Sequence, residues 1–367
     1  MNHRHPSVFL VLALAAPAAP ADPAPPPPAS VVASMRLAAD WQLAHPAKFA
    51  ADGWIQGAWY AGLSALRGMP GGEGYHSALL RIGKANDWQL GDRRYHADDQ
   101  CVGQTYAELY LSDRDPVMIS SLRARCDDIL AHPSPAGLAF DKLRNPDYLD
   151  RWSWCDSLFM APPAWVRLAA ASGNGAYARY AVDQWWVTTD FLYDRQERLF
   201  FRDSTFFPKR EANGRKVFWG RGNGWVIAGL ARTLEFLPAD EPARRRLEAL
   251  YREFAARLVG LQQSDGFWRS SLLDPDSFPL KESSGTGLIC FGLAWGMNHG
   301  VLDRASVRIP VLRAWDALAS CVTADGRVTH VQPVGASPKS FPADSALPYG
   351  VGAYLLAGSE VARIASR

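Results

Sequence analysis

Three aspartates lie where the sequence predicts the first turn of a helix, and their side chains are suited to acid–base chemistry. Asp98 and Asp99 fall in HADDQCVGQTYAELYL (96–111), and Asp156 falls in WCDSLFMAPPAWVRLA (154–169). An aspartate at such a position often only caps the helix. The sequence neighbours of Asp156 are apolar, however, and an apolar setting disfavours the charged form of a carboxyl group. The pattern indicates a general acid at Asp156, with Asp98 or Asp99 as a second carboxylate on a neighbouring helix.

The stretch WGRGNGW, from Trp219 to Trp225, combines three glycines with two flat apolar rings and one cation, Arg221. Glycines let the backbone approach a bound group closely, and a planar guanidinium pairs well with a carboxylate. The apolar run that follows has helical spacing, so the stretch lies at a helix N-terminus, which favours anions. This composition suits a sugar ring that bears a carboxylate. The alternative is a tight corner between helices, where Gly and Trp also gather.

Several other chemistries are disfavoured by the sequence. The segment ESSGTG (282–287) lacks the Gly-x-Ser-x-Gly nucleophile elbow of serine hydrolases. His96 and His330 have no nearby His and carboxylate spacing of the kind that a metal site needs. The cysteines are odd in number and form no CxxC pair, so we expect most of them to be small buried hydrophobic residues. They are Cys101, Cys126, Cys155, Cys290 and Cys321.

Residues 1–21 have the pattern of a secretory signal peptide. Arg4 precedes the apolar segment VFLVLALAA, and Ala19-Pro20-Ala21 supplies a small-x-small cleavage pattern. Residues 22–30 form a proline-rich leader that should be extended. We therefore expect an exported protein, either periplasmic or secreted, with no membrane association beyond export. Without Arg4 the chain has one more Lys and Arg than its 37 Asp and Glu, so nucleic acid is not an expected partner.

The remaining chain, 31–367, is dominated by apolar residues recurring at three and four positions, which is typical of helices. Strand-like alternation is scarce, and no linker divides the segment, so a single all-α domain is predicted. About a dozen helices in one domain favour helical hairpins in a closed ring, with loops at one end forming a concave site. The predicted helices are 31–45, 54–68, 75–86, 99–111, 116–131, 157–172, 175–194, 223–237, 241–263, 285–300, 305–320 and 349–365.

Six separated stretches together resemble glycoside hydrolase family 105, the unsaturated rhamnogalacturonyl hydrolases, and the related unsaturated glucuronyl hydrolases. They run from about residue 54 to the C-terminal end and are far more specific as a set than any one of them. The stretches are HADDQCVGQTY, WCDSLFMAPPAW, LFFRDSTFF, NGRKVFWGRGNGWVIAGLART, KESSGTGLICFGLAWGMNHGVLD and YGVGAYLLAGSEV.

This resemblance implies an (α/α)6 barrel and a reaction unlike ordinary glycoside hydrolysis. The substrate is an oligosaccharide left by a polysaccharide lyase, with a 4,5-unsaturated uronic acid at its non-reducing end. An acid residue protonates the enol ether at C4, water adds at C5, and the resulting hemiketal opens and expels the remaining sugar. No metal or organic cofactor is implied. We expect a rhamnogalacturonan-type substrate, such as a pectin fragment.

The resemblance also assigns residues. Asp156 matches the catalytic acid/base and Asp99 its partner carboxylate, while Asp98 is a further candidate for binding substrate. Some family members place a histidine upstream of the WxRGxGW stretch to contact the substrate, but this chain has none between His132 and His299, so Arg202 or Asp203 is expected to replace it. Near the start of the domain, Gln56 is a candidate hydrogen-bond donor beside the possible sugar-stacking rings of Trp54, Trp59 and Tyr60. The positions that match the pocket lining are Trp154, Met160, Trp219, Arg221 and Trp225.

Three alternatives remain at this point. The chain could be an unsaturated glucuronyl hydrolase acting on a different polysaccharide. It could keep the barrel and be a polysaccharide lyase or sugar epimerase, although these are expected to use a Tyr, His or Arg base, or paired histidines. It could also be a sugar-binding protein without catalysis. Placement of Asp156 on the outer surface, far from Trp219 and Arg221, would exclude the catalytic role.

Overall fold

The computed structural model describes residues 24–239 and 241–364, so the predicted signal peptide at 1–21 lies outside the described part. The described chain is mostly helical, as predicted, and the boundaries of the predicted helices differ from the observed ones by four residues or fewer. The helices are α1 Pro28–Ala44, α2 Trp54–Arg67, α3 Glu73–Ala85, α4 Gly103–Asp113, α5 Val117–Ala131, α6 Ser157–Met160, α7 Pro162–Ser172, α8 Gly175–Leu192, α9 Gly220–Leu234, α10 Pro242–Val259, α11 Ser283–Asn298, α12 Arg304–Ala319 and α13 Pro348–Ile364.

Two predicted boundaries need correction, and proline explains both. Helix α1 begins at Pro28, so residues 28–30 belong to the helix and not to the extended leader. Proline suits the first turn because its φ is already helical and its missing N–H is not needed there. The predicted helix 157–172 is interrupted at Ala161, since Pro162 and Pro163 lack the N–H groups that would continue the hydrogen-bond ladder of α6 into α7.

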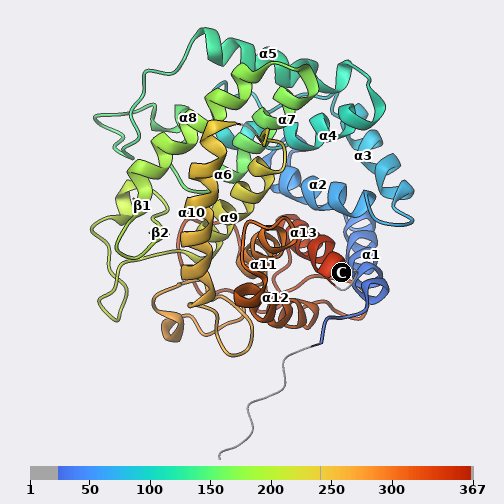
Figure 1. The fold of residues 1–367 in the computed structure, drawn as a ribbon, viewed down its shortest axis with the longest axis vertical. Helices are drawn as coiled ribbons and strands as arrows, with labels where there is room; N and C mark the ends of the chain where they lie inside the picture. The colour runs from blue at the N-terminus through green and yellow to red at the C-terminus, as the bar shows by residue number, and fades with distance from the viewer. Residues whose placement is uncertain (1–23, 240, 365–367) are drawn as a thin grey trace, which may run out of the picture.

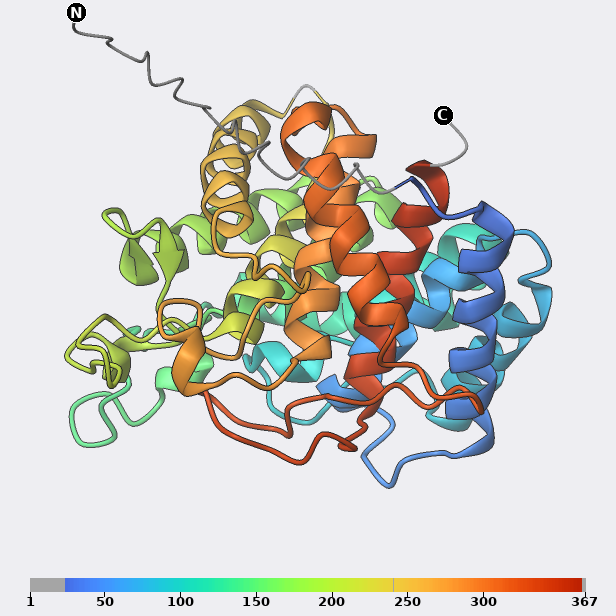
Figure 2. The ribbon, with the colours of Figure 1, turned by 90° about the horizontal axis from the view of Figure 1, so that it is seen from below.

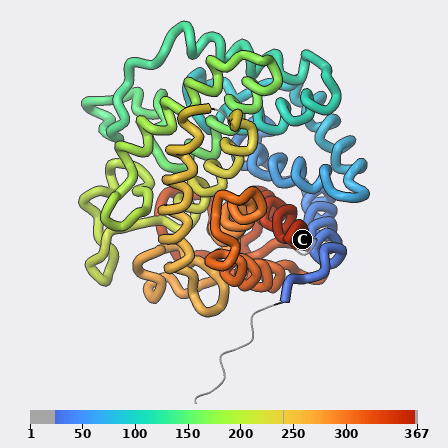
Figure 3. Tube along the Cα trace, in the orientation of Figure 1, coloured from blue at the N-terminus to red at the C-terminus, as the bar shows by residue number. Residues whose placement is uncertain are grey.

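Outer and inner helices alternate along the chain to form an (α/α)6 barrel (Figure 1). The inner ring contains α2, α4, the α6–α7 pair, α9, α11 and α13. The outer helices α1, α3, α5, α8, α10 and α12 cover it. The Cα trace passes around the ring in chain order, and α13 packs against both α1 and α2, which closes the ring (Figure 3). Helices α9 and α11 are buried along their whole length, whereas the outer helix α10 buries a single apolar face.

Glycines allow the inner helices to pack with backbones in contact. A Cβ atom on Gly62 of α2 would lie 2.4 Å from the Gly352 carbonyl oxygen of α13, and a Cβ on Gly352 would lie 2.2 Å from the Ala58 carbonyl oxygen. The α6–α9 contact has the same character, because a Cβ on Gly229 would lie 2.2 Å from the Leu158 carbonyl oxygen. Side chains larger than hydrogen are therefore excluded at these positions of the ring.

The N-termini of the inner helices converge at one end of the barrel, where the longer loops gather (Figure 2). A short hairpin, β1 (Tyr193–Asp194) with β2 (Leu199–Phe200), leads into the segment before α9, with Tyr193 opposite Phe200. The 3-10 turn η1 (Ala97–Gln100) precedes α4, and an extended segment from about residue 320 to 347 precedes α13. These connections place the candidate residues at one end.

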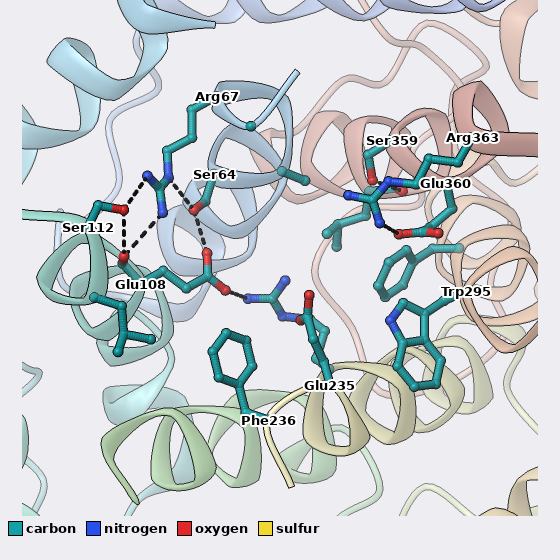
Figure 4. Close-up of a pocket in the computed structure, with 16 residues that line it drawn as sticks. Ser64, Arg67, Glu108, Ser112, Glu235, Phe236, Trp295, Ser359, Glu360 and Arg363 are labelled. Carbon is teal, nitrogen blue, oxygen red and sulfur yellow. Dashed lines mark hydrogen bonds and ion pairs between the residues drawn. The ribbon is translucent and has the colours of Figure 1, made fainter. Parts of the chain in front are cut away.

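At the opposite end of the barrel a cluster of charged side chains links four inner helices, and its Glu108 and Glu235 are labelled in Figure 4. The Glu108 carboxylate of α4 accepts hydrogen bonds from the Ser64 hydroxyl of α2, from Arg167 Nε of α7 at 2.6 Å and from Arg232 Nη2 of α9 at 2.8 Å. Arg167 also pairs with Glu235 at 2.7 Å. A cavity of about 380 Å³ lies beside this cluster. Cations suit this end because the C-termini of the inner helices carry partial negative charge.

All five cysteines are free and buried, as expected for small apolar residues. Residues 24–239 and 241–364 contain no helix with the length and apolarity needed to cross a membrane.

Candidate active site

A cavity of about 130 Å³ lies where the inner-helix N-termini meet. Two carboxylates and one cation share it with three indole rings, which is an arrangement suited to a sugar with an acidic group. The residues come from every quarter of the sequence. The lining is Trp54, Asp98, Trp154, Asp156, Met160, Arg202, Trp219, Val334 and Gly335.

Asp156 precedes the first residue of α6, but its carboxylate caps no backbone N–H of that helix. The Cys155 thiol donates to its Oδ2 at 3.4 Å, and Arg202 Nε lies 3.8 Å from the same oxygen. Burial raises the pKa of Asp156, while the Arg202 guanidinium opposes this rise. Asp156 therefore lies in the cavity without a capping function. Asp156 and Trp219 line the same cavity, so Asp156 does not have the outer-surface placement that would have excluded a catalytic role.

Asp98, in η1, lines the same cavity. Burial raises the pKa of Asp98 to about 7, and the nearby charge of Asp156 adds to the rise. Two such neighbouring carboxyl groups lose their protons as a coupled pair. The His96 ring lies next to Asp98: its Nδ1 accepts from the Asp98 N–H at 3.3 Å, and its ring is tilted against that of Trp154, with 4.9 Å between the centroids. Burial lowers the pKa of His96 to about 4, so this ring supports the site in its neutral form.

Asp99, the sequence-derived choice for the second carboxylate, is turned to other partners. Its carboxylate accepts from the Arg93 backbone N–H at 2.8 Å and from the Arg93 guanidinium, and it does not belong to the cavity lining. Gly91 makes this possible, because a Cβ there would lie 2.5 Å from the Asp99 carboxyl carbon. Asp99 thus fastens the 91–93 loop, and the structure places Asp98 beside Asp156 instead.

Arg202 lines the cavity, with about 20% of its side chain exposed. Its Nη1 donates to Asp203 at 2.7 Å, and its guanidinium stacks on Phe140 at 5.3 Å. Its backbone carbonyl accepts from the Cys155 N–H at 2.8 Å. The Arg202 segment is therefore tied directly to the segment that carries Asp156.

Arg221 is fully buried and is not part of the cavity lining. Its guanidinium donates to the carbonyl oxygens of Gln332 and Pro333, and it stacks on Trp219 at 4.5 Å. The Trp219 indole N–H donates to the Gln332 side chain at 2.8 Å. The predicted sugar-binding arginine thus holds the loop that carries Val334 to the cavity.

The remaining predicted residues divide between the cavity and its support. Trp154, Met160 and Trp219 line the cavity, whereas Trp225 lies beneath it, 4.7 Å from Phe159. Gln56 donates to the Ala47 carbonyl at 3.3 Å and does not line the cavity.

The glycines of WGRGNGW face protein and not a bound group. A Cβ on Gly220 would lie 2.3 Å from the Arg269 carbonyl oxygen, and one on Gly224 would lie 3.0 Å from the Gly285 carbonyl oxygen of α11. The alternative considered from the sequence, a tight corner between elements, describes these glycines.

Two lining residues, Val334 and Gly335, were not predicted. Their segment, HVQPVGASPK (330–339), carries no motif, and buried contacts with Arg221, Trp219 and Tyr349 bring it to the site. Trp54, considered only as a possible stacking ring, lies at the first turn of α2 and does line the cavity.

An (α/α)6 barrel with paired carboxyl groups and aromatic rings in its open end defines a carbohydrate-processing enzyme. The profile of Glycosyl Hydrolase Family 88 matches residues 29–365. The chain belongs to this family and is a glycoside hydrolase, which confirms the resemblance drawn from the six sequence stretches.

Three individual proteins illustrate the relationship. The chain is 39% identical over 344 residues to "Unsaturated 3S-rhamnoglycuronyl hydrolase" of Formosa agariphila, and the matched region covers 91% of each chain. A solved structure of "Glycosyl hydrolase family 88 from Bacteroides vulgatus" is 27% identical, with a TM-score of 0.83, and covers 92% of this chain and 99% of that one. A structure named "Polysaccharide Lyase BACCELL_00875" is 28% identical, with a TM-score of 0.83, and covers 92% and 98%.

Proposed function

We propose that the protein removes a 4,5-unsaturated uronic acid from the non-reducing end of lyase-generated oligosaccharides, with Asp156 as the proton donor. One observation carries the proposal: Asp156 and Asp98 share a cavity whose walls are the indole rings of Trp54, Trp154 and Trp219. The name of the Formosa agariphila relative supports this substrate class. A cavity of about 130 Å³ suits one terminal sugar ring better than an internal stretch of polymer.

The proposed chemistry begins with transfer of the Asp156 proton to C4 of the enol ether. Burial raises the pKa of this carboxyl group above its ordinary value, which favours the protonated form that a general acid needs. Water adds to the electron-deficient C5 and gives a proton to the Asp156 carboxylate, which restores the acid, and the resulting hemiketal opens to release the remaining sugar. No metal takes part in this sequence, because the carboxyl group supplies the proton.

Asp98 takes the role of the second carboxylate in this proposal, in place of Asp99. Its carboxyl group lines the cavity and interacts electrostatically with Asp156, whereas the Asp99 carboxylate is occupied by Arg93. Burial and the charge of Asp156 raise the pKa of Asp98 to about 7, so the pair retains a shared proton toward neutral pH. When that proton is on Asp156, Asp156 can act as the acid and the Asp98 carboxylate can accept a hydrogen bond from a sugar hydroxyl.

The sugar attached to the unsaturated residue is proposed to be a rhamnose. The relative's name, rhamnoglycuronyl hydrolase, supports rhamnose as the attached sugar, and both a rhamnose–glucuronate polymer and rhamnogalacturonan could supply it. Parallel assays with fragments of a rhamnose–glucuronate polymer and of rhamnogalacturonan decide between these sources.

The test is the ultraviolet absorbance of the C4–C5 double bond during incubation with unsaturated disaccharides. We expect the absorbance to fall with wild-type protein and to stay constant with Asp156→Asn. Asp99→Asn is the matched control, and we expect it to retain activity if folded. Constant absorbance with wild-type protein would refute the proposal, and a gain of absorbance on intact polymer would favour a lyase, as the name of one structural relative suggests.

We also propose that the protein is exported, to the periplasm or the medium, on the basis of the signal-like sequence at residues 1–21. Expression of the full chain, followed by N-terminal sequencing of the exported protein, tests this. Cleavage after Ala21 is expected, and an intact Met1 on protein found only in the cytoplasm would refute export.

A further inference from the structure

Arg202 is the cation that the described residues place in the cavity wall. The sequence favoured Arg221 for binding a substrate carboxylate, but two of its nitrogens already donate to backbone carbonyls behind the wall. Arg202 is one of the two residues that the sequence offers in place of the family's histidine, and a guanidinium presents more donors than an imidazole in a geometry that matches a carboxylate.

One edge of the Arg202 guanidinium is left unused. Nη1 donates to Asp203 at 2.7 Å, and Phe140 covers one face of the group. Nε is buried and has no hydrogen-bond partner in 24–239 or 241–364; Asp156 Oδ2, at 3.8 Å, is beyond hydrogen-bond distance. A buried donor without a partner is costly, so this nitrogen is available to an acceptor on a bound molecule.

The geometry of the substrate class fits this edge. In a 4,5-unsaturated uronic acid the C6 carboxylate is attached to C5, so the carboxylate carbon lies two bonds from C4. A carboxylate held by Arg202 therefore brings C4 close to Asp156, whose Oδ2 is 3.8 Å from Nε. The same contact would orient the ring between the Trp154 and Trp219 faces.

We propose that Arg202 binds the C6 carboxylate of the unsaturated uronic acid and thereby makes the cavity specific for uronic acids. This inference rests on the proposed function and names the group that selects the substrate. Under this proposal the bound substrate also promotes protonation of Asp156. A carboxylate on Arg202 offsets the positive charge that favours ionised Asp156, and it adds a negative charge nearby. Both effects favour the protonated form of Asp156 in the complex.

The surroundings of Asp156 are consistent with this coupling. Burial raises its pKa, and the Arg202 charge is the largest effect that opposes the rise. Substrate binding on Arg202 would thus remove the main opposition and draw the proton shared with Asp98 toward Asp156. The charged and titratable groups around Asp156 are Arg202 and Asp203 from the segment after β2, Arg221 from α9, Asp98 from η1 and the neighbouring Cys155 thiol.

The test compares an unsaturated uronyl disaccharide with its C6 methyl ester, which keeps the double bond and removes the charge. A charge-assisted hydrogen bond of this kind corresponds to about 10- to 100-fold in kcat/KM. We expect wild-type protein to prefer the acid over the ester by about this factor. Arg202→Gln should bring the ratio close to one by losing activity on the acid, and Arg202→Lys should give an intermediate ratio.

Lys209→Gln is the matched control, because Lys209 is an exposed cation on the same segment that packs on Phe206 and does not line the cavity. Its acid-to-ester ratio should equal that of wild type. If Arg202→Gln does not fold, as judged by circular dichroism, the ratio of Arg202→Lys decides. A wild-type ratio in the folded Arg202 variant would overturn the inference while leaving the proposed function intact. A wild-type protein inactive on both substrates would instead refute the proposed function.

A pH profile separates this role from a merely structural one. Loss of the Arg202 charge raises the pKa of Asp156 in the free protein, so the alkaline limb of kcat/KM in Arg202→Gln should move to higher pH. The limb of kcat should move less, because in the wild-type complex the substrate already offsets that charge. If the alkaline limbs of kcat/KM and of kcat lie at the same pH in Arg202→Gln as in wild type, the proposed coupling is contradicted.

Discussion

Asp98→Asn should make the protein more stable at alkaline pH while impairing catalysis. In the folded protein the pKa of Asp98 is raised from 3.8 to about 7, first by burial and then by the charge of Asp156. The unfolded chain therefore releases this proton near pH 4, whereas the folded protein keeps it until about pH 7. Between these values the unfolded state binds fewer protons, so the stability of the wild-type protein falls as pH rises.

The size of this effect follows from the same shift. The full difference between the two pKa values corresponds to about 4 kcal/mol of unfolding free energy above pH 7. About 20% of the Asp98 side chain is exposed, so water reduces the cost, and we expect about 2–4 kcal/mol. Asparagine has the shape of the neutral acid and does not ionise. The stability gain of Asp98→Asn should thus be near zero at pH 4 and largest at pH 8.

Urea denaturation of wild-type protein and Asp98→Asn at pH 4, 6 and 8 measures this gain directly. Asp99→Asn provides the control, since it changes the adjacent residue but breaks the contact with Arg93. That variant should be less stable than wild type by about 1–2 kcal/mol at pH 6 and above. The reasoning fails if Asp98→Asn is no more stable than wild type at pH 8, or if its gain does not grow with pH.

Three further predictions concern the barrel that holds the site. Glu108→Gln should cost about 3–5 kcal/mol in urea denaturation at pH 7, because the buried Arg232 loses its ion pair and Arg167 keeps only its pair with Glu235. Burial alone would raise the pKa of Glu108, but the two guanidinium groups lower it to about 2. The stability difference between wild type and Glu108→Gln should therefore shrink as pH falls from 4.5 toward 2. A difference that stays constant over this range would show that the Glu108 charge is not what stabilises the cluster. Gly352→Ala should lower the thermal midpoint and reduce the free energy of unfolding by more than about 2 kcal/mol, because the new Cβ would lie 2.2 Å from the Ala58 carbonyl oxygen. An unchanged midpoint would show that α2 and α13 can move apart without cost. Arg221→Gln should raise KM more than it lowers kcat, because the loop at Gln332 and Pro333 loses its anchor, and a kcat loss at constant KM would instead favour direct contact with the reacting sugar.

The sequence by itself determined the helices, because burial of one face or of a whole helix leaves a periodic apolar pattern that does not depend on distant contacts. The pattern therefore predicted the all-α class, and the apolar residues next to Asp156 in the chain, which are buried in the structure, marked it as a candidate. The family resemblance added the barrel and the substrate class.

Only the tertiary structure decided which of two adjacent aspartates shares the cavity. Asp98 and Asp99 occupy successive positions of one 3-10 turn, so their side chains point in different directions, and Gly91 and Arg93 take Asp99 away from the site. The position of Arg221 behind the wall was likewise invisible in WGRGNGW, because its partners are backbone carbonyls more than 100 residues away. Local patterns record which residues are apolar or charged, whereas the direction of each charged side chain depends on partners that only folding brings together.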